Sequence, residues 1–553
     1  MALLAESKPE IAPPVVAVVG KESAGKSQLI SSLTRQSAYS ANFRGSTLSC
    51  EIFEDPDGRT FVDTPGILRQ SDSITTRLAL NQLSTSDVVL LVLPATHAKD
   101  DLTELLPLVE GKFGAVVLTF WDRLPDRHQA SSRERVESLA CACGVQVIPV
   151  DARSVSAEQR QQILDALENP ARFETGKMEL CLSWRCLPRP TLLENRWLGP
   201  VLASLLLLGP AVAAVWLANQ LAGLLDPRIQ KLVAPLVAAL AGLHSLPHEI
   251  LAGPYGLITM GPLLLVWAAP TVALFSLGLG IYKASGLLDR ISTAIHPLIL
   301  RVGLTGRDVV RVVMGFGCNV PAVINTRACS SCSRPPTVAA IAFGSACSYQ
   351  LSATLAVFAA AGRPGLALPY LLYLVATTLI YLRLTSPAAA RSPLNVLVAG
   401  QNTFLTWPRW SSIWHEARLV LAHFFKTAVP VFLVISGVAS LLSWLGVVPA
   451  LARLLGPVMR VFGLPAEAAL PVVMASIRKD GLLLFAQQDS LTGLSSAQIL
   501  TGVYLAGVLL PCLVTALTIG REQSPRFTLK LMARQALAAS VFAFALSWLA
   551  RLW

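Results

Sequence analysis

Two cysteines lie where glycine and proline interrupt long apolar stretches of the chain. Residues 315–322 read Gly-Phe-Gly-Cys-Asn-Val-Pro-Ala, and the pair Pro511-Cys512 stands inside the apolar run 504–515. Non-helical backbone at membrane depth is tolerated only where it is buried in protein or lines a wet cavity. Taken alone, Cys318 fits a metal ligand and a small buried side chain at a kink equally well. Matching breaks in two halves of a membrane protein are typical of a transport site, so the pair favours metal binding.

A charged cluster, Arg478-Lys479-Asp480, lies between these two breaks in an otherwise apolar stretch. Charged side chains at such depth are costly and usually face a pathway or a partner. Elsewhere, His244 and His248 have the spacing of one helix face and could collect a cation, but surface histidines are the simpler interpretation. The charged cluster is therefore the stronger functional signal of the two.

A phosphate-binding pattern lies near the N-terminus. Residues 20–27 read Gly-Lys-Glu-Ser-Ala-Gly-Lys-Ser, directly after the apolar run 15–19 and before a helical pattern that reaches Thr34. This is G-x-x-x-x-G-K-[ST] in the strand-to-helix context it requires. Backbone N–H groups would curl around phosphate oxygens, Lys26 would face the β- and γ-phosphates, and Ser27 would bind Mg²⁺. The predicted nucleotide contacts in this loop are Gly20, Ser23, Ala24, Gly25, Lys26 and Ser27.

Two further segments complete a predicted nucleotide switch. Asp63 ends the strand signal 61–63, where a carboxylate suits the Mg²⁺ shell, and Gly66 follows where backbone can reach the γ-phosphate. Thr47 is placed to close over Mg²⁺. Lys26, Thr47 and Gly66 are the predicted catalytic residues, and Ser27, Thr47 and Asp63 the predicted Mg²⁺ ligands. The nucleotide contacts expected from these segments are Gly45, Ser46, Thr47, Asp63, Thr64, Pro65 and Gly66.

Base recognition is expected after the later strands, which the apolar runs 88–93, 115–118 and 146–150 predict. In GTPases the fourth motif is N-x-x-D, whose carboxylate pairs with guanine. Here Asp122 is present, but Thr119 stands where Asn is expected, and Ala152 and Arg153 follow the last strand. Guanine is favoured, and a general NTPase is the alternative.

Composition divides the chain into a soluble part and an apolar part. Hydrophobic residues make up 53% of the chain and charged residues 14%, and the apolar residues concentrate after residue 197. We expect a soluble domain at 1–175, a short linker at 176–196 and a membrane domain at 197–553, with gate regions at about 256–382 and 424–552. The first 14 residues do not resemble a signal peptide, so the soluble domain is expected in the cytoplasm. The net charge of +11 fits basic cytoplasmic loops, and no nucleic-acid partner is expected.

Seven segments are long and apolar enough to be predicted as membrane spans, and 309–323 and 466–488 are predicted as broken or re-entrant segments. With this count the Arg-rich loops 283–308 and 383–422 face the cytoplasm and the chain ends outside. The predicted spans are Leu198–Leu221, Gly256–Tyr282, Pro336–Ala361, Leu366–Leu382, Phe424–Leu445, Ala497–Ile519 and Gln535–Leu552. The fold class is thus an α/β P-loop GTPase domain with a mostly parallel sheet, fused to an all-α polytopic membrane domain.

These motifs together resemble the FeoB ferrous iron transporter family. The match is most specific at residues 315–322 with Thr326-Arg327 and at 510–515 with Arg521-Glu522, which look like the two gate motifs of that family. Gly45-Ser46-Thr47 resembles its G-V-T switch, Ser331-Cys332-Ser333 its C-S-A-R motif, and Arg478-Lys479-Asp480 its [RA]-K-E. The chain departs from the family at Ser23, which replaces an Asn linked to potassium-stimulated hydrolysis, and in the helical spacer, which is largely missing.

The resemblance implies a slow GTPase coupled to uptake of Fe²⁺ across the bacterial inner membrane, using GTP and Mg²⁺. It also implies a small soluble FeoA-like partner and leaves room for a homo-oligomer. Ligands for the transported metal would be Cys318, Asn319, Cys332 and Cys512, and Mn²⁺ or Zn²⁺ would also suit such a set. A membrane-tethered GTPase sensor without transport is the alternative from another functional class.

Overall fold

A computed structural model of the chain describes residues 15–21, 24–35, 50–67, 74–123, 136–137, 139–140, 143–152, 154–174, 188–253, 256–391, 404–408, 410–487 and 493–549. Its internal contacts divide the chain into two units, Met1–Arg189 and Pro190–Trp553. The division falls within residues 176–196, the stretch where the sequence predicts a linker.

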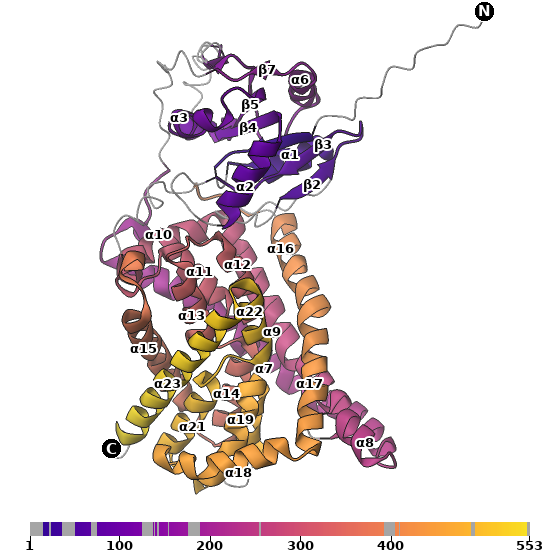
Figure 1. The fold of residues 1–553 in the computed structure, drawn as a ribbon, viewed down its shortest axis with the longest axis vertical. Helices are drawn as coiled ribbons and strands as arrows, with labels where there is room; N and C mark the ends of the chain where they lie inside the picture. The colour runs from indigo at the N-terminus through magenta and orange to yellow at the C-terminus, as the bar shows by residue number, and fades with distance from the viewer. Residues whose placement is uncertain are drawn as a thin grey trace, which may run out of the picture. The chain divides into compact units, whose positions relative to one another are not determined.

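The first unit is built on a mostly parallel sheet, which confirms the predicted fold (Figure 1). Its strands are β1 (Val15–Val19), β2 (Glu51–Glu54), β3 (Thr60–Asp63), β4 (Val88–Pro94), β5 (Phe113–Thr119), β6 (Val147–Pro149) and β7 (Ala171–Arg172). The order is β2-β3-β1-β4-β5-β6, with β7 beside β5; only the pairs β2–β3 and β5–β7 are antiparallel. All seven residues of β4 are buried, as expected for a parallel strand covered on both faces.

Helices cover both faces of this sheet and create two separate cores. The helices are α1 (Lys26–Thr34), α2 (Ile74–Thr85), α3 (Ala98–Val109) and α6 (Ala157–Glu168). One core joins Ala17 and Val19 of β1 to α2 and α3, and the other joins Val16 and Val18 to α1 and α6. Because side chains alternate along β1, a single strand supplies both cores. The carboxyl ends of β1, β3 and β5 therefore form a rigid edge that positions the nucleotide-site residues.

The second unit is helical and consists of two halves with the same order of elements. The first half contains α9 (Leu257–Ser285), α10 (Leu287–Ile299), α11 (Gly306–Met314), α12 (Asn319–Asn325), α13 (Arg334–Gly344), α14 (Ser348–Ala360) and α15 (Ala367–Thr385). The second contains α17 (Val429–Trp444), α18 (Val447–Met459), α19 (Ala469–Ile477), α20 (Leu484–Gln487), α21 (Ser496–Val508), α22 (Leu513–Glu522) and α23 (Pro525–Leu549). Outside the halves lie α7 (Leu198–Ala239), α8 (Ser245–Ala252) and α16 (Trp410–His423).

Each half runs through a bent pair, a short broken segment, a broken apolar helix and an unbroken helix. The bent pairs are α9–α10, with an angle of 89°, and α17–α18, with an angle of 77°. Gly286 and Gly446 separate the two helices of each pair with φ of 80° and 74°, values that favour glycine. In this order the break that ends at Cys347 corresponds to the break that ends at Cys512. Asn319 corresponds to Lys479, because Asn319 begins the helical segment after α11 and Lys479 begins the one after α19. The two halves meet where α12 contacts α22 and where α14 contacts the 3₁₀ turn Lys479–Leu483.

The helices are compatible with the seven predicted spans. Five helices among the described residues are long and apolar enough to cross a membrane, or up to seven if each bent pair is one span. These seven correspond one to one with the predicted segments, and the first, α7, is longer than expected at 42 residues. The two segments expected to be broken are indeed short and interrupted, at 315–318 and at Arg478. Which side of the membrane each loop faces stays a prediction.

Two details of the span prediction were wrong. Residues 410–422 were assigned to a loop, but they form α16, which continues through the π-helical turn Phe424–Ala428 into α17. Scattered charges lowered the hydropathy there without breaking the helix. The span at 336–361 was expected to be continuous, but it breaks at 345–347. Gly344 precedes this break and packs so closely on Thr378 that a Cβ would lie 2.5 Å from its side chain.

Candidate functional site

The phosphate-binding loop has the close contacts that its glycines predict. A Cβ on Gly20 would lie 2.3 Å from the carbonyl oxygen of Val92, so only glycine fits between β1 and β4. The Lys26 ammonium donates to the carbonyl oxygens of Gly20 at 3.3 Å and of Lys21 at 2.9 Å, and the side chain is 6% exposed. The backbone of the loop therefore positions the Lys26 ammonium at the place where phosphate oxygens would bind.

Ser27 and Asp63 meet at the carboxyl edge of the sheet. Ser27 Oγ donates to Asp63 Oδ2 at 2.5 Å, and Asp63 Oδ1 is buried without a hydrogen-bond partner in the described part of the chain. A hydroxyl beside an unsatisfied carboxylate oxygen is a donor set that suits Mg²⁺. Burial raises the pKa of Asp63 to about 6, although Lys26 and the hydrogen bond from Ser27 act in the opposite direction. The two residues thus fit the predicted Mg²⁺ shell.

Asp63→Asn is expected to stabilise the unit without nucleotide and Mg²⁺, by about 1–3 kcal/mol at pH 7.5. Because the folded-state pKa is about 6, above the ordinary value of 3.8, ionising Asp63 costs folding free energy at neutral pH. The gain from Asn should shrink as the pH falls through 6 and vanish near the unfolded-state value. Urea unfolding of residues 1–189 at several pH values measures this. Asp87→Asn, at an exposed position, is the matched control; an equal gain there, or a pH-independent gain at Asp63, would contradict the prediction.

The adjoining residues hold the end of β3 against the loop. Thr64 Oγ1 donates to Val18 O at 2.7 Å, and the Ile67 N–H donates to Gly20 O at 3.1 Å. Pro65 and Gly66 between them are buried. This anchoring places the predicted γ-phosphate contact of Gly66 on a fixed backbone.

Thr119 plays a structural part that the sequence did not indicate. Its hydroxyl donates to the carbonyl oxygen of Ala24 at 2.6 Å, with a longer 3.3 Å contact to that of Leu93, and the side chain is fully buried. Thr119 therefore stabilises the phosphate-binding loop through a hydrogen bond to its backbone. Asp122, the predicted guanine contact, lies exposed in the 3₁₀ turn Trp121–Arg123. Ala152 follows β6, and its carbonyl oxygen accepts from Ser32 at 2.9 Å.

Some predicted residues lie outside the described part of the chain, namely Ser23, Gly45, Ser46, Thr47 and Arg153. The sequence did not predict the ion pairs that the side chain of Lys21 makes. Lys21 Nζ lies 2.8 Å from both Asp101 and Glu104 of α3. Burial lowers the pKa of Lys21, but the two carboxylates outweigh it and raise the pKa overall. No spacing in the sequence links position 21 to α3, so only the fold reveals this tie.

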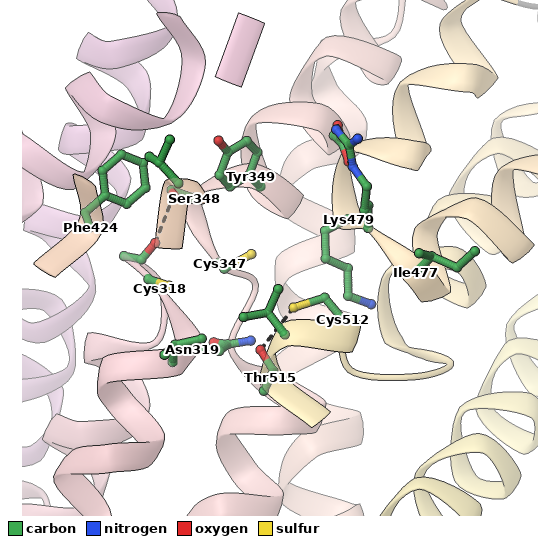
Figure 2. A pocket seen from close by; sticks show the side chains of 16 residues that line it. Cys318, Asn319, Cys347, Ser348, Tyr349, Phe424, Ile477, Lys479, Cys512 and Thr515 are labelled. Carbon is green, nitrogen blue, oxygen red and sulfur yellow. Dashed lines mark hydrogen bonds and ion pairs between the residues drawn. The ribbon is translucent and has the colours of Figure 1, made fainter. Parts of the chain in front are cut away.

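The breaks of the second unit surround one pocket with a cavity of about 80 Å³ (Figure 2). This volume has room for several water molecules. Cys318, Asn319, Cys347 and Cys512 line it, as does Lys479 from the charged cluster. The cysteines of the two predicted breaks, Cys318 and Cys512, therefore line the same pocket, although they come from different halves.

Each of the three pocket cysteines immediately precedes the first residue of a helix after a break: Cys318 before α12, Cys347 before α14 and Cys512 before α22. Two polar contacts are made at these breaks. Ser348 Oγ donates to Gly317 O at 2.8 Å, and Cys512 Sγ lies 3.0 Å from Thr515 Oγ1. The hydrogen bond from Ser348 thus ties Gly317 to the start of α14.

Cys332, another predicted ligand, does not line this pocket, and its role on the metal path stays a prediction. It lies in the turn before α13, at a helix end rather than at a break, and its Sγ is 3.3 Å from Ser330 Oγ. Cys347 lines the pocket instead. The signal for Cys347 was weak, a run of small residues, Ser-Ala-Cys-Ser, inside an apolar stretch. Among the described residues no group of three or more His, Cys, Asp and Glu is arranged to hold a metal ion, so the pocket is not a preassembled cluster.

An ion-pair cluster joins the segments that follow the two gate motifs. Glu522 accepts from Arg327 at 2.9 Å and 2.7 Å in a two-pronged contact, and from Arg334 at 3.1 Å. Arg327 and Arg334 come from the first half and Glu522 ends α22 of the second. The halves are therefore linked at a second place besides the pocket.

Comparisons with known proteins agree with both units. A family model described as a 50S ribosome-binding GTPase matches residues 15–119, and one described as nucleoside recognition matches residues 265–363. The Fe(2+) transporter FeoB of Synechocystis sp. is 26% identical over 411 residues, covering 65% of this chain and 64% of the relative. That of Helicobacter pylori (strain J99) is 21% identical and covers 57% of this chain and 54% of the relative. The chain thus spans less than two thirds of the length of these curated relatives.

Among solved structures, NFeoB from S. thermophilus bound to GDP·AlF4⁻ and K⁺ is 19% identical, with a TM-score of 0.25. The alignment with this structure covers 43% of this chain and 86% of the NFeoB chain. In its gate motifs, its phosphate-binding loop and its sequence similarity to the two curated relatives, the chain is similar to the FeoB ferrous iron transporters.

Proposed function

We propose that the chain is a GTP-gated transporter that takes up ferrous iron across the bacterial cytoplasmic membrane, with its first unit in the cytoplasm. The observation that carries the proposal is that three cysteines, from breaks in both halves, line one pocket. Apolar helices need no such breaks to span a membrane, and thiols with freed backbone carbonyls are suitable ligands for a borderline-soft cation. Mn²⁺ and Zn²⁺ are the competing substrates.

The pocket residues would act in turn on a passing ion rather than hold it in a finished site. Cys318, Cys347 and Cys512 offer sulfur, and the Asn319 side-chain oxygen is buried without a hydrogen-bond partner among the described residues. Such donors can replace part of the hydration shell of Fe²⁺ during passage. Weak binding at several successive points favours release as well as entry.

In the first unit, the loop around Lys26 and Ser27 would bind the nucleotide phosphates. When bound, Mg²⁺ would neutralise phosphate charge beside Ser27 and Asp63. Ile67 follows Gly66, where a Gln orients the attacking water in some GTPases, and its side chain is buried at 1% exposure. Slow hydrolysis follows, which suits a gate better than a pump. Asp122 supports guanine as the base.

We also propose a small soluble FeoA-like partner, and this proposal leaves room for a homo-oligomer. A relative from Porphyromonas gingivalis, 32% identical over 62 residues, is named as a fusion of Fe(2+) transport protein A with FeoB. A protein fused to one relative is a candidate separate partner for another. No nucleic-acid partner is proposed, because the positive charge fits cytoplasmic loops.

Uptake of Fe²⁺ into proteoliposomes that contain the purified chain tests the proposal. Uptake above protein-free vesicles, and a larger uptake with GTP than with GDP, is expected. Parallel assays with Mn²⁺ and Zn²⁺ identify the preferred ion. Binding of GTP without movement of any of the three ions would favour the sensor alternative instead.

A further inference from the structure

The Lys479 ammonium sits at the break between α21 and α22 of the second half. Its Nζ donates to the carbonyl oxygens of Gly507 and Leu510, both at 2.6 Å, and the side chain is 6% exposed. Figure 2 shows this side chain extending toward the segment that carries Cys512. A positive charge is thus held inside the pocket by backbone oxygens.

These two carbonyls are the groups that a metal ion would use at a broken helix. The last carbonyls of a helix have no partner within it, and a break at membrane depth leaves them to a side chain, water or an ion. Both oxygens lie at the same short distance from one nitrogen, so they already converge on a single point. Cys512 and Thr515, whose side chains lie 3.0 Å apart, line the same pocket.

The corresponding position in the first half carries no charge. Asn319 holds the place of Lys479 in the order of elements, and its amide donates to Ser345 O at 3.4 Å, in the break before Cys347. A neutral amide therefore makes one long hydrogen bond where Lys479 makes two short ones. If the only need were to pair break carbonyls, an amide would suffice in the second half as well, without the cost of burying a charge.

We propose that the Lys479 ammonium occupies a cation site formed by the Gly507 and Leu510 carbonyls beside Cys512, and that a divalent transition-metal ion must displace it to bind there. The thiol beside the carbonyls selects this class of ion over alkali cations. Identifying the ion with the transported one rests on the proposed function, but the site itself does not.

Titration of the purified full chain in detergent with Co²⁺, followed by thiolate-to-cobalt absorption, tests the site. Lys479→Met removes the competing charge and keeps most of the stem, so Co²⁺ should bind about tenfold more tightly or better. Lys479→Arg keeps the charge and should bind no more tightly than the parent. Adding Cys512→Ser to Lys479→Met should abolish the gain. Lys530→Met, the same change at an exposed position of α23, should leave the affinity unchanged.

Parent-like Co²⁺ affinity in a folded Lys479→Met variant would overturn the proposal. If that variant does not fold, Lys479→Gln replaces it, because glutamine keeps a donor for one carbonyl. If neither neutral variant folds, the role of Lys479 is to cap the end of the helix, and the proposed site is also overturned. The titration needs neither GTP nor flux. Tight binding in Lys479→Met without uptake by the parent would therefore refute transport alone, and uptake without the affinity gain would refute the site alone.

Discussion

Replacing Lys26 with alanine is expected to lower the affinity of the chain for GTP by about 100-fold or more. The ammonium lies at the mouth of the phosphate-binding loop, within 3.3 Å and 2.9 Å of two loop carbonyls. There it can exchange those carbonyls for β- and γ-phosphate oxygens. Each charge-assisted hydrogen bond contributes about 1.5–3 kcal/mol, and losing two of them accounts for this factor. Titration of residues 1–189 with a fluorescent GTP analogue measures the change.

The matched control is Lys99→Ala, which removes the same side chain from an exposed position on α3. Its affinity for GTP should equal that of the parent, and both variants should remain folded. An unchanged affinity in Lys26→Ala would remove the assignment of the phosphate-binding loop. ATP bound as tightly as GTP by the parent would instead leave the loop in place and identify a general NTPase.

The fold of the first unit could be predicted because its signals are local. A buried parallel strand is a continuous apolar run, and the loop after β1 must carry glycines wherever backbone approaches phosphate. The residues 15–27 therefore specify strand, loop and helix within one short window. Thr119 was harder to interpret, because its bond to Ala24 joins residues that only the order of strands brings together. The contacts of Lys21 with α3 likewise join residues that only the fold brings together.

In the second unit, breaks that contain glycine, proline or charged residues could be predicted, and the break at 345–347, made of small residues, could not. The glycines and prolines of 315–322 and at Pro511 predict a break in the helix, whereas residues 345–347 are small and look like part of a continuous span. Because this break was missed, Cys347 was left out of the predicted ligand set, whereas Cys332 lies in the segment that resembles the C-S-A-R motif. The matching order of the two halves then shows that Cys347, not Cys318, is the counterpart of Cys512.

Cys318→Ser and Cys512→Ser are each expected to lower the rate of Fe²⁺ uptake by about tenfold or more. The substitution keeps the side-chain volume nearly constant and replaces a soft donor with a hard one. Both side chains line the pocket, so the loss should occur in both variants and also in Cys347→Ser. A cysteine that merely filled a core would tolerate the change with little loss of transport. Uptake into proteoliposomes at matched protein density measures the rates.

Cys332→Ser provides the control, because Cys332 is a cysteine of the same domain that does not line the pocket. It should transport Fe²⁺ at close to the parent rate. GTP affinity should stay at the parent value in all four variants, since the nucleotide site lies in the other unit. Parent rates in both Cys318→Ser and Cys512→Ser would refute a cysteine-lined path. An equal loss in Cys332→Ser would show that the path includes the turn before α13, as the sequence alone suggested, and that the pocket is only one part of it.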